Sequence, residues 1–129
     1  MKFAYMGAFG LFGIFARYFL GLFVSRYFTT PFPYASFFIN IMGSFFVGVV
    51  YVLGTEKAIL NPEMRIAIMV GLLGGFTTFS AYSLETARLI EDARFWLAGL
   101  NFCLSPIAGV LSALGGLHLT RLLMSRGAS

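Results

Sequence analysis

The sequence predicts an all-α integral membrane protein with four transmembrane helices, on the basis of three observations. Of the 129 residues, 59% are hydrophobic and only 11% are charged, whereas roughly a quarter of the residues in soluble domains are charged. Positions 33–55, 66–84 and 95–120 contain no charged residue. Each stretch approaches or exceeds the ~20 residues that a helix needs to cross a bilayer. We therefore expect one membrane domain over residues 1–129.

The first predicted helix covers residues 3–24, where the only charge is that of Arg17. The second covers residues 33–54. Pro31 stands before it and Pro33 is its first residue, and prolines there favour a turn over a helix continued from the preceding segment. The link between these two helices is therefore short.

The third predicted helix covers residues 64–88. Pro62 precedes it and suits the first turn of a helix. The polar segment Glu91-Asp92-Ala93-Arg94 then separates it from the fourth predicted helix, residues 95–123. None of the links is long enough to form a domain outside the membrane.

The third helix is predicted to be broken near the middle of the membrane. Gly74-Gly75 stands just before Thr77-Thr78. Each glycine disfavours a continuous helix by ~1 kcal/mol relative to alanine, and the hydroxyls can bond freed backbone groups. Freed carbonyls at membrane depth suit a cation, and freed N–H groups suit an anion. The alternative is an unbroken helix with a tight packing face.

Basic residues lie on both sides of the predicted membrane domain. Five are on the side of the termini and three are on the other side. These are Lys2, Lys57, Arg65, Arg121 and Arg126 on the first side, and Arg26, Arg88 and Arg94 on the second. Such a weak bias is compatible with insertion in both orientations or with one preferred orientation. Insertion in both orientations predicts an antiparallel, two-fold homodimer that supplies two inverted repeats.

Four side chains inside the predicted helices suggest a path for an anion. Arg17 either snorkels to the interface or faces an aqueous entrance. Asn40 offers two N–H donors to an anion or makes an interhelical hydrogen bond. Phe79 and Tyr82 share a helix face. Their positively polarised ring edges suit a small anion, although core packing is the alternative.

Hydroxyl groups continue this polar pattern on two helices. Thr78, Ser80 and Ser83 lie on the third helix, and Ser105 and Ser112 lie on the fourth. The middles of all four helices lack a carboxylate, which argues against proton-coupled transport. The chain has no nucleophile paired with a base, no metal-ligand cluster and no basic run. We therefore expect neither an enzyme nor a nucleic-acid-binding protein.

Three motifs resemble the CrcB/Fluc family of fluoride channels, and the resemblance covers essentially the whole chain. The motifs are Gly13-x-x-x-Arg17-Tyr18, Asn40-x-x-Gly43-Ser44-Phe45-x-x-Gly48 and Gly74-Gly75-Phe76-Thr77-Thr78-Phe79-Ser80-x-Tyr82-Ser83-x-Glu85. The resemblance implies a dual-topology, antiparallel homodimer with two fluoride pathways and a central structural sodium ion. It also implies passive fluoride export through the plasma membrane, and hence fluoride resistance.

The resemblance further assigns roles to individual residues. The backbone carbonyls of Gly74 and Thr77 would bind the sodium ion. The fluoride pathway would use polar groups, one ring edge and an entrance arginine. These residues are Asn40, Phe79, Tyr82, Thr78, Ser80, Arg17 and either Ser105 or Ser112.

The sequence departs from the family pattern at two positions. Tyr82 stands where a second pore phenylalanine is expected, and Val110 stands where a serine is expected after Ala108-Gly109. The first departure keeps open a channel built from two unlike subunits. A non-conducting subunit that requires a partner is a further alternative. A proton-coupled exporter is the least favoured, because residues 3–24 hold no carboxylate.

Overall fold

The computed structural model describes residues 1–128, and every regular element in that range is helical. Four helical spans are long and apolar enough to cross a membrane. They are Lys2–Tyr27, Tyr34–Glu56, Pro62–Glu91 and Phe95–Gly127. The prediction of an all-helical protein with four membrane spans is therefore confirmed, with helix ends within about four residues of the expected ones.

The middle two spans are each built from more than one helical element. The first and last spans are single helices. The elements are α1 (Lys2–Tyr27), α2 (Tyr34–Tyr51), η1 (Val52–Glu56), α3 (Pro62–Ile66), η2 (Ala67–Leu73), α4 (Gly74–Phe76), α5 (Phe79–Glu91) and α6 (Phe95–Gly127). Both η elements are π-helical. Asn61 caps α3, because its side chain accepts the Met64 N–H at 2.8 Å.

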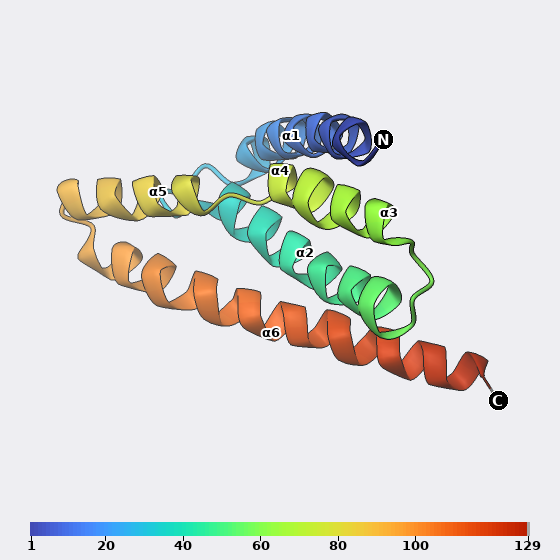
Figure 1. Cartoon of the computed structure of the whole chain (residues 1–129). Helices are drawn as coiled ribbons and strands as arrows, with labels where there is room; N and C mark the ends of the chain where they lie inside the picture. The colour runs from blue at the N-terminus through green and yellow to red at the C-terminus, as the bar shows by residue number, and fades with distance from the viewer. Residues whose placement is uncertain (129) are drawn as a thin grey trace.

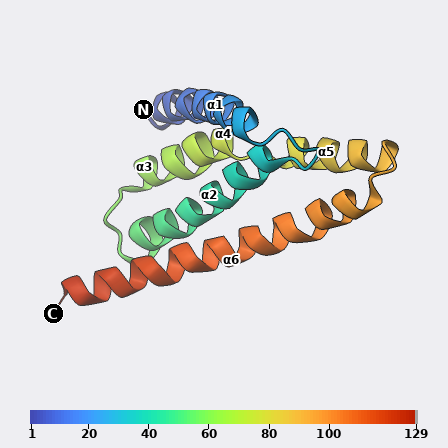
Figure 2. The same ribbon diagram turned by 180° about the vertical axis from the view of Figure 1, so that it is seen from behind.

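The helices pack side by side in a fixed order. Helix α6 runs along α2, while α1 lies over η2 and α4 on the other side of the molecule (Figures 1 and 2). The α2–α6 contact depends on Gly116, where an added Cβ would overlap the Phe45 carbonyl. The α1 contact likewise depends on Gly13, where a Cβ would overlap the Leu72 carbonyl. Small residues thus let these backbones approach closely.

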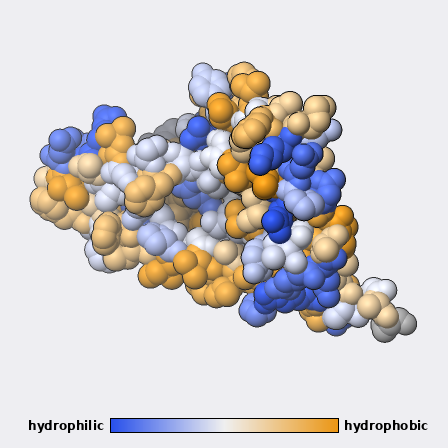
Figure 3. Space-filling model, viewed as in Figure 1, coloured by the Kyte–Doolittle hydropathy of each residue, from blue (hydrophilic) through white to orange (hydrophobic). Residues whose placement is uncertain are grey.

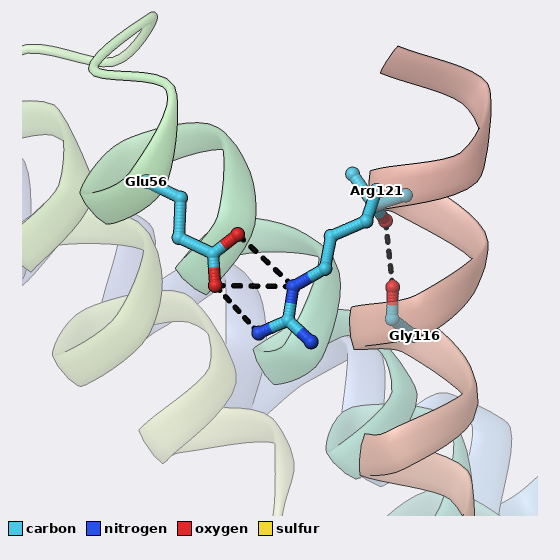
Figure 4. A network of polar contacts seen from close by, with 4 residues as sticks. Glu56, Gly116 and Arg121 are labelled. Carbon is cyan, nitrogen blue, oxygen red and sulfur yellow. Dashed lines mark hydrogen bonds and ion pairs between the residues drawn. The ribbon is translucent and has the colours of Figure 1, made fainter. Parts of the chain in front are cut away.

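Polar residues gather at the ends of the molecule, and apolar residues cover much of the rest of the face in Figure 3. At the end near the C-terminus, the single Nε–H of Arg121 is shared between the two Glu56 carboxylate oxygens, at 3.1 and 3.0 Å (Figure 4). Arg121 Nη2 makes the accompanying ion pair at 2.5 Å. This paired geometry joins η1 to α6. Both termini and the link between η1 and α3 lie toward this end (Figure 1).

Candidate functional site

The third span is interrupted between α4 and α5. Thr77 has φ −86° and ψ 158°, and Thr78 has φ −152° and ψ 114°, so both residues are extended. The Thr78 hydroxyl caps α5 by accepting the Ala81 N–H at 3.2 Å. Gly74 and Gly75 are helical. The extended residues are therefore the two threonines and not the glycine pair before them.

Asn40 on α2 binds the interruption through both ends of its amide. Its Nδ2 donates to the Thr78 carbonyl at 3.1 Å, and the Thr78 N–H donates to its Oδ1 at 2.8 Å. In a continuous α-helix the Thr78 N–H would instead bond the Gly74 carbonyl. Asn40 thus substitutes for the missing helical partner. Its second Nδ2 hydrogen remains available for another acceptor.

Gly43 on α2 allows the extended segment to approach. A Cβ there would overlap the side-chain methyl of Thr77. The Thr77 hydroxyl turns back and donates to the Leu73 carbonyl at 2.9 Å, which also accepts the Thr77 N–H at 2.9 Å. Gly43, the first glycine of the second motif, therefore makes room for the interruption.

A cleft of about 470 Å³ opens beside the interruption, between α2, α5 and α6. Six residues predicted from the sequence line it: Asn40, Thr77, Thr78, Phe79, Tyr82 and Ser105. The other lining residues are Ser44, Val47, Pro106, Gly109, Val110 and Ala113. Phe79 is 79% exposed in this single chain. Every residue in the lining is uncharged, so the cleft offers hydrogen-bond donors and ring edges and no fixed charge.

The hydroxyl groups near the cleft differ in whether their hydrogens are already donated within the protein. The Thr78 and Ser80 hydroxyls share one hydrogen bond at 3.2 Å. One O–H hydrogen of this pair therefore remains for a third acceptor. The Ser105 hydroxyl donates to Asn101 Oδ1 at 2.8 Å, and the Ser112 hydroxyl donates to the Ile41 carbonyl at 2.7 Å. Both serines of α6 thus have their hydrogens engaged within the protein.

Four of the site residues predicted from the sequence lie outside the cleft lining. Ser112 connects α6 to α2. Ser80 contacts the lining through Thr78. Arg17 is half-buried on α1, and Gly74 lies in α4 with an exposed surface. The structure therefore brings together residues of α2, α5 and α6 and leaves Arg17 apart from them.

A second polar cluster was missed from the sequence. Asn101 on α6 is 1% exposed. Its Nδ2 donates to the Thr86 hydroxyl at 2.8 Å, and that hydroxyl donates to the Tyr82 carbonyl at 2.8 Å. An amide inside an apolar run was the signal that singled out Asn40, and the same signal was present at Asn101.

A half-buried carboxylate also lies on α5. Glu85 Oε1 accepts a hydrogen bond from the Ser36 hydroxyl at 2.6 Å, while Oε2 is buried with no partner among the described residues. The sequence placed Glu85 near a helix end. In the structure it contacts the first turns of α2, and so stands beside the same helix that carries Asn40.

Four apolar spans, an interrupted third span and an uncharged polar cleft are features of a multi-pass membrane transport protein. The described residues 1–128 hold no cluster of His, Cys, Asp or Glu that would bind a metal ion. Residues 4–117 match the model of the CrcB-like protein family, Camphor Resistance (CrcB). The chain belongs to this family, which comprises transport proteins and not enzymes.

Curated relatives resemble the chain along most of its length. It is 38% identical over 119 residues to the fluoride-specific ion channel FluC of Citrifermentans bemidjiense, covering 92% of this chain and 96% of the relative. It is 39% identical over 124 residues to the FluC of Maridesulfovibrio salexigens, covering 96% and 98%. The FluC of Trichormus variabilis is 41% identical over 111 residues, covering 85% and 81%.

Proposed function

We propose that this protein is a fluoride-selective channel of the plasma membrane that exports fluoride passively and so confers fluoride resistance. The observation that carries the proposal is the uncharged cleft where Asn40, Thr78 and Phe79 meet. The name of the relatives, fluoride-specific ion channel, supports the same ion.

The chemistry of the cleft suits a small, strongly hydrated anion. Such an ion must exchange its water for other donors as it enters a narrow path. The free Asn40 N–H and the unshared hydrogen of the Thr78–Ser80 pair supply donors. The Phe79 ring supplies a positively polarised edge. With no cationic side chain in the lining, the ion is not trapped.

The direction of transport follows from acid–base chemistry and the membrane potential. Hydrogen fluoride is a weak acid that crosses lipid as the neutral molecule and ionises inside the cell. A negative interior then drives the anion outward, because each elementary charge gains about 2.3 kcal/mol per 100 mV. A passive channel is therefore sufficient, and no coupling carboxylate is needed.

We further propose that two copies assemble as an antiparallel, dual-topology homodimer. A single chain leaves Phe79 exposed beside polar groups of the interruption. We place the interruption near the middle of the bilayer, where irregular backbone must be covered by protein or water. A second copy would cover it and supply the inverted repeat. The weak charge bias supports insertion in both orientations.

We propose a structural sodium ion at the centre of this dimer. The donor set fits: the Thr78 N–H bonds Asn40 and leaves the Gly74 carbonyl without its usual helical partner. Thr77 is extended, so its carbonyl lies outside the hydrogen-bond pattern of the helix. Gly74 and Thr77 would hold the ion through these carbonyl oxygens, which suit a hard cation. The ion would fix the two interruptions against each other.

Removing the Phe79 ring tests the pathway. Phe79→Ile keeps an apolar side chain but loses the ring edge, worth ~0.5–1.5 kcal/mol. In bacteria that lack their own fluoride exporter, we expect the wild-type chain to permit growth in fluoride. The variant should lower the tolerated fluoride concentration by about twofold to tenfold.

Phe3→Ile is the matched control, because Phe3 is also largely exposed, at 72%, but lies at the start of α1. Its growth should equal the wild type at equal membrane expression. Unchanged resistance in Phe79→Ile would contradict the place of the Phe79 ring on the proposed pathway.

A further inference from the structure

The Tyr82 hydroxyl has a defined partner across the α5–α6 contact. It donates a hydrogen bond of 2.8 Å to the backbone carbonyl of Phe102 on α6. The tyrosine side chain also lines the cleft. The hydroxyl hydrogen is therefore committed to the protein and not directed to a passing ion.

The Phe102 carbonyl needs such a donor because of Pro106. In an α-helix, the carbonyl of residue 102 accepts the N–H of residue 106. Proline has no N–H, and Pro106 lies inside the continuous helix α6. The carbonyl it frees would be costly in the membrane interior without another partner. Tyr82 supplies that partner from the neighbouring helix.

We propose that Tyr82 and Pro106 act as a coupled pair, in which the proline frees a carbonyl and the tyrosine hydroxyl binds it to hold α5 against α6. Two residues that line one cleft are thereby joined through Phe102. The hydroxyl therefore makes an interhelical hydrogen bond, from Tyr82 to the Phe102 carbonyl, and does not bind the anion. We call this hydrogen bond the latch. The statement about the anion rests on the proposed fluoride function, whereas the latch itself does not.

The surroundings of Tyr82 support a latch. Its backbone carbonyl accepts the Thr86 hydroxyl, which in turn accepts from the buried Asn101 of α6. Asn101 also accepts the Ser105 hydroxyl. Tyr82 is thus connected to α6 at its backbone through this relay and at its hydroxyl directly. Loss of the hydroxyl removes one of these connections and leaves the other in place, so a Tyr82→Phe variant should still fold.

A double-mutant cycle tests the coupling. The wild type, Tyr82→Phe, Pro106→Ala and the double variant are unfolded reversibly in detergent. Hydrogen bonds between membrane helices contribute ~0.6–1.7 kcal/mol, so Tyr82→Phe should raise the unfolding equilibrium constant about threefold to twentyfold. In the Pro106→Ala background, the new N–H satisfies the Phe102 carbonyl. The tyrosine substitution should then have less than half the effect, in logarithmic units.

Tyr18→Phe is the matched control, because it removes a hydroxyl from an exposed tyrosine on α1 for which no hydrogen bond is found within residues 1–128. It should leave stability unchanged in both backgrounds. An equal effect of Tyr82→Phe in the wild-type and Pro106→Ala backgrounds, or no effect in either, would overturn the coupling.

Fluoride efflux from liposomes distinguishes the latch from an ion ligand. If the hydroxyl only holds α5 against α6, any loss of efflux in Tyr82→Phe should be smaller in the Pro106→Ala background, where the Phe102 carbonyl has its own helical partner. A loss of more than about tenfold in both backgrounds would show instead that the hydroxyl binds the anion. If even the wild type conducted no fluoride, the proposed function would fail, while the unfolding cycle would still decide the latch.

Discussion

Replacing Asn40 by leucine should nearly abolish fluoride efflux. The substitution leaves both the N–H and the carbonyl of Thr78 without their Asn40 partner. Each buried polar group left unpaired costs ~1–3 kcal/mol. It also removes the amide donor that faces the cleft. Efflux from liposomes should fall on the order of a hundredfold, because a loss of about 2.8 kcal/mol corresponds to a factor of that size.

Asn40→Asp separates the two roles of this side chain. The carboxylate can still accept the Thr78 N–H, but it cannot donate and it repels an anion. We expect this variant to fold, as judged by a single symmetric peak in size-exclusion chromatography, and to show no measurable fluoride efflux from liposomes. Wild-type efflux in either variant would contradict the placement of Asn40 on the fluoride path.

Replacing Gly116 by alanine should destabilise the fold more than any other glycine-to-alanine change on α6. The new Cβ would overlap the carbonyl of Phe45 and approach the Val49 nitrogen. Both obstacles are backbone atoms, so α2 itself must shift. Overpacking of this kind costs ~1–3 kcal/mol. The midpoint of unfolding in detergent should fall accordingly.

The adjacent Gly115 provides the matched control, because nothing lies within 4 Å of a Cβ built there. Alanine favours a helix over glycine by up to ~1 kcal/mol. Gly115→Ala should therefore leave the midpoint unchanged or raise it. Equal midpoints for the two variants would show that α2 and α6 do not pack as described.

The four spans could be predicted from the sequence because membrane insertion is governed by long apolar runs, which are local. The side chains that meet across helices were harder to foresee. Asn40 was identified as an unusual amide in an apolar helix, but its two bonds to Thr78 depend on how α2 packs on the interruption. Asn101 carried the same signal and was overlooked.

The position of the helix interruption shows the same limit. The glycine pair and the threonine pair together predicted a break near the middle of the third helix, without singling out which residues leave the helix. In the structure Gly74 and Gly75 are helical, and the extended residues are Thr77 and Thr78. Tertiary contacts override propensity here, because Asn40 provides Thr78 with the partners that a continuous helix would otherwise supply. Likewise, nothing in the sequence connects Pro106 on the fourth predicted helix with Tyr82 on the third. Only the fold shows that both meet at the Phe102 carbonyl.

Fluoride efflux from liposomes that contain only this purified chain tests the central claim most directly. Chloride efflux from matched liposomes is the control. We expect fluoride to leave rapidly under a potassium-driven negative potential, and chloride to stay inside. Retention of fluoride by a folded, reconstituted protein would contradict a self-sufficient channel and point to a missing partner subunit. Release of both anions would contradict fluoride selectivity.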